Sequence, residues 1–80
     1  MANKPWHEDQ QALQTILKQI RSESELSQTG LAKLLSKPQS FVSKYESGER
    51  RLDYLEVRAI CQGCGTTITK FENKLSKLLR

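Results

Sequence analysis

Apolar residues recur at helical spacing along almost the whole chain, in five short runs separated by breaks of only a few residues. The first run places Leu13, Ile16, Leu17 and Ile20 at i, i+3, i+4 and i+7, so they share one face of a helix. No run alternates apolar and polar residues as a strand does. With 80 residues, the chain is predicted to form one all-α domain with a modest core.

The breaks contain residues that start and stop helices. Ser27 can accept a hydrogen bond from the first turn that follows it, and Asp53 with Glu56 has the spacing of a capping box. Gly48 suits the left-handed backbone of a helix end. We therefore predict a flexible N-terminal segment at 1–8 and one domain at 9–80, with helices at about 9–24, 28–35, 38–46, 54–63 and 67–79.

The later helices are predicted to contribute their inward apolar positions to the core. These positions are Leu31, Ala32, Leu34, Leu35, Phe41, Val42, Tyr45, either Leu55 or Val57, Ile60, Cys61 and Cys64. The last helix carries Ile68, Phe71, Leu75, Leu78 and Leu79 on one side.

The second and third predicted helices are separated only by residues 36–38, which is the connection length that a helix-turn-helix requires. The outer face of the third helix carries four hydrogen-bonding side chains, which are Gln39, Ser40, Ser43 and Lys44. An α-helix fits the major groove of DNA, where glutamine can pair with adenine and lysine can donate to guanine. The pattern predicts a helix that reads double-stranded DNA.

The charge distribution favours the same partner. The formal net charge is +4, and residues 33–51 carry five basic against two acidic side chains. Residues 1–26 instead carry three basic and four acidic side chains. The positive excess therefore begins where the predicted helix-turn-helix lies, as expected for a protein that binds a polyanion.

Other classes of function find little support in the residues. Cys61 and Cys64 have a C-x-x-C spacing, but His7 is the only histidine, so the four ligands of a zinc site are missing. We interpret both cysteines as core residues of a helix and expect no metal and no cofactor. The chain has no clustered carboxylates, no glycine-rich phosphate loop and no nucleophile beside a base, so we expect no enzyme.

No apolar run approaches the ~20 residues that a membrane span needs. The polar start at residues 1–11 has no signal-peptide core. The sequence predicts a cytoplasmic protein with no membrane partner.

Several segments together resemble the Cro/C1-type helix-turn-helix family, also called the Xre family, over residues 13–65. The resembling residues are 26–28, 31–32, 38–46, 48–53 and Ile60. The resemblance implies a compact five-helix lambda-repressor-like domain with its helix-turn-helix at about 27–46. It also implies a transcriptional regulator, such as a repressor, that binds an inverted-repeat operator as a homodimer.

The resemblance assigns roles one residue at a time. It implies base contacts by Gln39, Ser40 and Lys44, with Ser43 a further candidate. Positions near the DNA backbone are matched by Gln28, Tyr45, Ser47 and Arg50, and the charges of Lys37 and Arg51 add two phosphate candidates with a solvated role as the alternative. For Gln28 the alternative is to support the third helix. Arg21 and Glu46 match a pair that forms a partly buried, structural salt bridge.

Two positions depart from the family pattern. Ser36 stands where the family commonly has glycine, so the turn is expected to be strained if its φ is positive. Gly30 stands where the family often has glutamate, which should weaken the second helix by about 1 kcal/mol relative to alanine.

The last predicted helix, with Ile68, Phe71, Leu75 and Leu78 on one side, has two interpretations. The stripe can close the core, or it can form the surface of a homodimer, and we expect a role in both. The alternative function is a protein-interaction module or antitoxin partner that keeps the helix-turn-helix shape. The polar face of the third helix argues against that alternative.

Overall fold

The structure is a computed structural model that describes residues 5–79, with side chains from residue 8 onward. This part of the chain contains five helices and no strand, so the predicted all-α class is confirmed. The helices are α1 (Pro5–Glu23), α2 (Gln28–Leu34), α3 (Gln39–Ser47), α4 (Tyr54–Gly63) and α5 (Ile68–Leu79).

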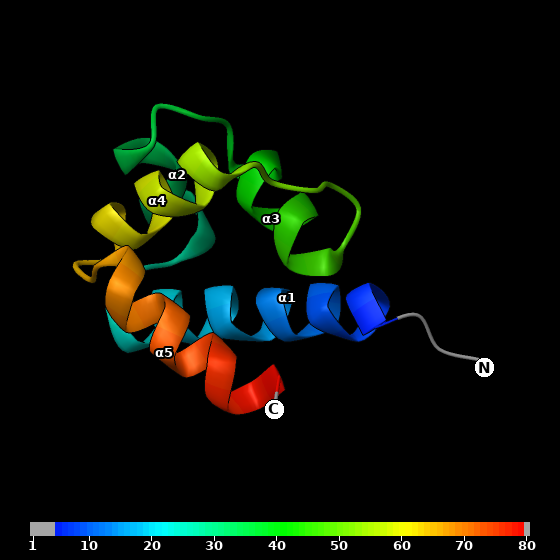
Figure 1. Cartoon of the computed structure of the whole chain (residues 1–80). Coiled ribbons are helices and arrows are strands. Elements are labelled where there is room, and N and C mark those ends of the chain that lie inside the picture. Colours follow the sequence, from blue (N-terminus) through cyan, green and yellow to red (C-terminus); the bar gives the residue numbers. More distant parts are fainter. Residues whose placement is uncertain (1–4, 80) are drawn as a thin grey trace.

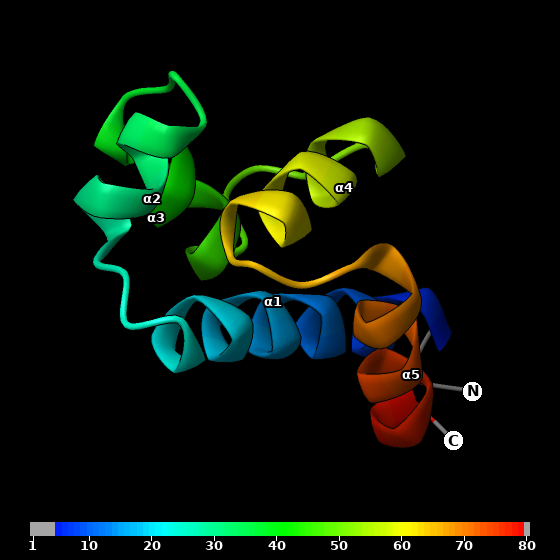
Figure 2. The same cartoon turned by 90° about the vertical axis from the view of Figure 1, so that its left-hand side faces the viewer.

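The longest helix, α1, forms one side of the molecule, and α2, α3 and α4 lie together above it (Figure 1). The view turned by 90° shows α5 folding back beside α1 after the α4–α5 connection (Figure 2). Because α1 contacts both α3 and α5, it joins the group of α2, α3 and α4 to α5 in one packed unit.

The predicted helix starts are present. The Ser27 side chain accepts a hydrogen bond from the Gly30 N–H at 2.9 Å. At α4, the Asp53 carboxylate accepts from the Glu56 N–H at 2.8 Å, and Glu56 accepts from the Asp53 N–H at 2.9 Å. This reciprocal capping box satisfies two N–H groups that a helix end otherwise leaves unpaired.

The first helix begins earlier than the periodicity predicted. Because α1 starts at Pro5, residues 5–8 are part of the helix. Residues 1–4 lie outside the described part of the chain. Proline is well suited to a first helical turn, where its missing N–H has no partner to lose.

Packing between α1, α2, α3 and α4 forms the core, with α5 adding Phe71. Leu17, Leu31, Val42 and Ile60 are at most 1% exposed. The thiols of the two cysteines are free and buried in the same core.

Leu34, predicted to be inward, is exposed by 61% instead, and of the two candidates in α4 it is Leu55 that is exposed, by 69%. In α2 the inward positions are taken by Leu31 and Ala32, so Leu34 is left on the solvent side of a helix of only seven residues. In α4 the core position belongs to Val57, which is 8% exposed.

Candidate nucleic-acid interface

A Schellman-type turn ends α2 and sets the direction of α3. The Lys37 N–H bonds to the Ala32 carbonyl at 2.9 Å and the Ser36 N–H bonds to the Lys33 carbonyl at 3.1 Å. Ser36 has a φ of 57°, the left-handed conformation that the family's glycine adopts without cost. Serine therefore holds a left-handed backbone conformation here and stores some backbone strain in the turn.

The amphipathic pattern of α3 separates its anchoring side chains from its polar ones. Phe41 and Val42 are buried, whereas Gln39, Ser40 and Lys44 are exposed. Ser43 is partly exposed on the same helix. The structure thus brings the four residues predicted to read bases onto the outer side of one helix that packs on α2 and α1.

A chain of hydrogen bonds connects this helix to α1 and α2. The Arg21 guanidinium donates to both carboxylate oxygens of Glu46, at 2.7 and 3.0 Å, and to the Leu26 carbonyl at 2.9 Å. The Arg21 and Glu46 side chains are 12% and 4% exposed. The hydrogen bond to Glu46 raises the pKa of Arg21, which keeps the guanidinium charged.

Gln28 extends this chain to the polar face of α3. Its amide nitrogen donates to Glu46 at 3.0 Å, and its amide oxygen accepts from the Gln39 amide at 2.7 Å. The pairing of Gln28 with Gln39 was missed by sequence reasoning, because the two residues lie on different helices. The arrangement fits the alternative role of Gln28, which is to support the third helix.

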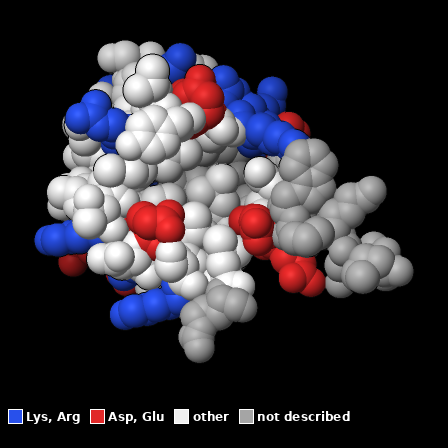
Figure 3. Space-filling view, in the orientation of Figure 1, with Lys and Arg blue, Asp and Glu red and all other residues white. Residues whose placement is uncertain are grey.

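A hollow of about 280 Å³ lies beside the start of α3 and is lined by Lys37, Pro38, Ser40, Phe41, Lys44 and Arg50. The Arg50 guanidinium lies 4.7 Å from the centroid of the Phe41 ring, and the Lys37 ammonium lies 5.5 Å from it. Figure 3 shows Lys and Arg side chains gathered along the upper right of the molecule, over α3 and the segment that follows it.

Arg50 also forms an ion pair that the sequence did not reveal. Its two terminal nitrogens donate to the two carboxylate oxygens of Glu56, at 3.1 and 2.9 Å. The hydrogen bond to Arg50 lowers the pKa of Glu56, and the same bond raises the pKa of Arg50. Both side chains are exposed enough that water screens the pair, so we expect it to orient Arg50 more than to stabilise the fold.

Tyr45 was predicted to contact phosphate, and this is wrong for the described structure because its side chain is inside the core. Tyr45 is 1% exposed, and its ring packs edge to face against Phe41 at a centroid distance of 5.4 Å. Its hydroxyl is buried with no hydrogen-bond partner in the described residues. Burial raises the pKa of Tyr45.

The remaining phosphate candidates stay on the surface after α3. Ser47 is exposed, and its hydroxyl can donate either to the Lys44 carbonyl at 3.1 Å or to the Glu49 carboxylate at 3.3 Å. Arg51 is also exposed.

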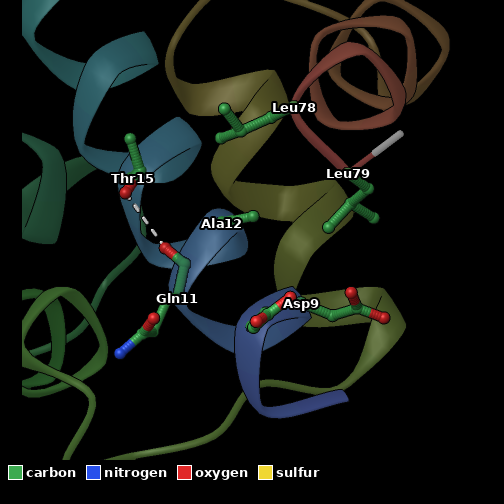
Figure 4. Close-up of a pocket in the computed structure, with 7 residues that line it drawn as sticks. Asp9, Gln11, Ala12, Thr15, Leu78 and Leu79 are labelled. Carbon is green, nitrogen blue, oxygen red and sulfur yellow. Dashed lines mark hydrogen bonds between the residues drawn. The ribbon is translucent and has the colours of Figure 1, made fainter. Parts of the chain in front are cut away.

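The stripe predicted on α5 is divided by the fold. Phe71 is 3% exposed and belongs to the core, which removes it from any dimer surface. Ile68 and Leu75 pack partly against that core. Leu78 is 52% exposed, and Figure 4 shows it with Leu79 across from α1, near Ala12 and Thr15.

The two thiols lie in an apolar environment. Burial raises the pKa of Cys61 to about 11, and it also raises the pKa of Cys64. No group of three or more potential metal-ligating side chains occurs among the described residues. The side chain of His7 lies outside them. Within the described part of the chain, no helix is long and apolar enough to cross a membrane.

Two short helices joined by a tight turn, the second with a polar outer face, define a helix-turn-helix DNA-binding domain. The helix-turn-helix domain family matches residues 14–73, and the chain belongs to that family. Its fold and relatives identify it as an Xre-type DNA-binding domain of the class that regulates transcription, which confirms the resemblance inferred from the sequence.

Solved structures agree with this assignment. An XRE-family like protein from Pseudomonas syringae pv. tomato str. DC3000 is 42% identical, with a TM-score of 0.83, covering 89% of this chain and 87% of that one. The Restriction-Modification Controller Protein C.Esp1396I, solved as a mutant, is 24% identical, with a TM-score of 0.81 and coverages of 89% and 95%.

The clp gene regulator ClgR from C. glutamicum is 15% identical, with a TM-score of 0.78 and coverages of 90% and 92%. The last two matches support the fold alone. No curated protein matches the chain.

Proposed function

We propose that the protein represses transcription by binding an inverted-repeat operator as a homodimer, with α3 of each copy in the major groove. The observation that carries the proposal is the exposed polar face of α3, held in place by the hydrogen bonds from Arg21 through Glu46 and Gln28 to Gln39. An orderly set of donors and acceptors on one rigid helix is what direct readout of base edges needs.

The proposed contacts fall into two groups. Gln39, Ser40, Ser43 and Lys44 face the base edges. The backbone contacts are Gln28, Lys37, Ser47, Arg50 and Arg51. Gln28 also supports Gln39, whose amide it binds at 2.7 Å. A backbone contact contributes affinity on any DNA, whereas a base contact distinguishes one sequence from another.

A homodimer is part of the proposal because one recognition helix contacts only half of a typical operator. On α5, Leu78 is the exposed member of the stripe, with Ile68 and Leu75 partly exposed. We propose that these three residues contribute to the contact between copies, which a C2-symmetric dimer would use twice.

Selection of bound sequences from a random duplex pool, followed by sequencing, tests the function. Enrichment of an inverted repeat with half-sites about one helical turn apart is the expected result. Gln39→Ala should relax preference at one base position, whereas Lys70→Ala, on the exposed side of α5, should leave the selected sequence unchanged. No enriched sequence, with binding lost at physiological salt, would contradict the proposal and favour a protein-interaction module or antitoxin partner.

A further inference from the structure

Three cations from three segments surround the hollow beside α3. Lys37 lies in the turn before α3, Lys44 lies within the helix, and Arg50 follows it. The other lining residues are Pro38, Ser40 and Phe41, so no carboxylate lines the hollow. Its volume of about 280 Å³ can accommodate a tetrahedral oxyanion together with some water.

Arg50 is already oriented at the edge of this hollow. Its guanidinium is paired with Glu56 and lies over the Phe41 ring, so binding does not have to order a free side chain. The hydrogen bonds to Glu56 and to the Arg51 carbonyl use three of the five N–H donors of an arginine. Two donors therefore stay available to an incoming oxyanion.

The start of α3 adds to the same positive environment. The N-cap residue is Pro38, which supplies no side-chain acceptor for the first turn. The N–H groups of Gln39 and Ser40 therefore have no side-chain cap, and the N-terminal end of a helix dipole favours a negative charge. The Ser40 side chain lines the hollow and can donate one further hydrogen bond.

We propose that this hollow, defined by Lys37, Lys44 and Arg50, is a binding site for a single phosphate group, called the seat below. The proposal rests on the proposed DNA binding for one source of the ligand, a phosphodiester of the operator backbone. A free phosphorylated small molecule has the same chemistry and is the other source. This site therefore reassigns Lys44, which the proposed function places among the base-reading residues, to a phosphate, whereas Gln39 and Ser43 keep their base contacts. Free phosphate then competes with DNA for the site.

An NMR titration of the whole protein with inorganic phosphate, at an ionic strength held constant with chloride, tests the seat without DNA. The expected result is a saturable set of amide shifts confined to residues 37, 39–44 and 50. Lys37→Gln and Arg50→Gln should each weaken phosphate binding about tenfold, the effect of losing one charged hydrogen bond. Lys70→Gln, on α5, should leave phosphate binding unchanged.

Two results would overturn the seat. One is that the phosphate-induced amide shifts spread to lysines all over the protein, and the other is that the Lys37 and Arg50 substitutions leave phosphate binding unchanged. Folding of each variant is checked by its amide spectrum without phosphate, so loss of binding is separated from loss of structure.

The DNA arm uses the selected operator with one phosphate at a time replaced by a neutral methylphosphonate. We expect the methylphosphonate at one position in each half-site to weaken binding of the wild-type protein. The same methylphosphonate should weaken binding of the Lys44→Gln variant little further, because the two changes remove the same contact. If Lys44→Gln instead changes the preferred base at one position, Lys44 reads a base and the proposal is wrong.

The two arms separate the seat from the proposed function. Saturable phosphate binding without any specific DNA binding would support the seat, with a free phosphorylated compound as its ligand, and would contradict the proposed function. Specific DNA binding with no phosphate-sensitive position near these residues and no saturable binding of free phosphate would overturn the seat and keep the proposed function.

Discussion

At the scale of single residues, two buried polar groups differ in how well they are satisfied. The Glu46 carboxylate is 4% exposed and accepts hydrogen bonds from Arg21 and Gln28. The Tyr45 hydroxyl is buried without a hydrogen-bond partner in the described residues. A buried polar group costs free energy when it is left unpaired. Removing the partner of Glu46 should therefore destabilise the fold, whereas removing the Tyr45 hydroxyl should stabilise it.

Removing Arg21 should destabilise the fold strongly. Arg21→Ala leaves the Glu46 carboxylate buried without its counter-ion, and we expect the free energy of unfolding to fall by about 3 kcal/mol. Urea denaturation followed by circular dichroism measures the change. The double variant Arg21→Met with Glu46→Leu, which removes both charges, is the matched control and should recover most of the loss. A loss below about 0.5 kcal/mol in Arg21→Ala would mean that water screens the pair as it does on a surface.

Tyr45→Phe should stabilise the protein, because it removes the unpaired hydroxyl and keeps the ring that packs on Phe41. We expect the free energy of unfolding to rise by about 1 kcal/mol. Thermal unfolding of the variant beside wild type measures it. A lower melting temperature would show that the hydroxyl has a partner, such as a buried water molecule.

At the scale of elements, the connection between α2 and α3 is the strained part of the helix-turn-helix. Ser36 holds a positive φ of 57° at the position after the C-cap of α2. Left-handed backbone favours glycine, since other L residues meet a steric cost there. The turn nevertheless keeps both hydrogen bonds of a Schellman motif, so packing on either side determines the geometry.

Ser36→Gly should relieve this strain and stabilise the protein by about 0.5–1 kcal/mol, after the greater flexibility of glycine in the unfolded chain is counted. Chemical denaturation measures the gain. Ser36→Ala is the control, because it removes the hydroxyl and keeps the strained backbone, so it should bring no gain. Equal stability of the glycine and alanine variants would contradict the account.

At the scale of the whole molecule, the core contains two thiols and one phenol, those of Cys61, Cys64 and Tyr45, which are buried in their protonated form. Burial raises the pKa of Cys61 to about 11 and raises the pKa of Cys64 and Tyr45. In the unfolded chain, thiols ionise near pH 8.5 and the phenol near pH 10. Below those pH values the three groups are protonated in both the folded and the unfolded protein, so the free energy of unfolding does not depend on their ionisation. Above those values the groups ionise more readily in the unfolded chain, which favours unfolding.

The protein should therefore lose stability progressively from about pH 8.5 to pH 11. Urea unfolding midpoints at several pH values across this range measure the loss. Tyr45→Phe should reduce the loss above pH 10, where the phenol ionises in the unfolded chain. A midpoint that stays constant up to pH 11 would mean that these groups ionise equally well in the folded state.

Local sequence patterns predicted most of the fold. Capping residues and 3.6-residue periodicity are short-range properties, so the bounds of α2 to α5 were predicted to within about one residue at each end. The same pattern placed Gln39, Ser40 and Lys44 on the outer side of α3 before any packing was known. The early start of α1 was missed, because its first turn carries no apolar periodicity that marks it as helical.

The sequence by itself determined the helices, the turn length between α2 and α3, and the polar face that DNA is proposed to meet. Only the tertiary structure decided which side chains are partners across helices. It joined Gln28 to Gln39 and Arg50 to Glu56, and it left Leu34 in solvent. Periodicity reports which residues share a face of one helix, whereas the partner of each face depends on how separate helices pack against one another.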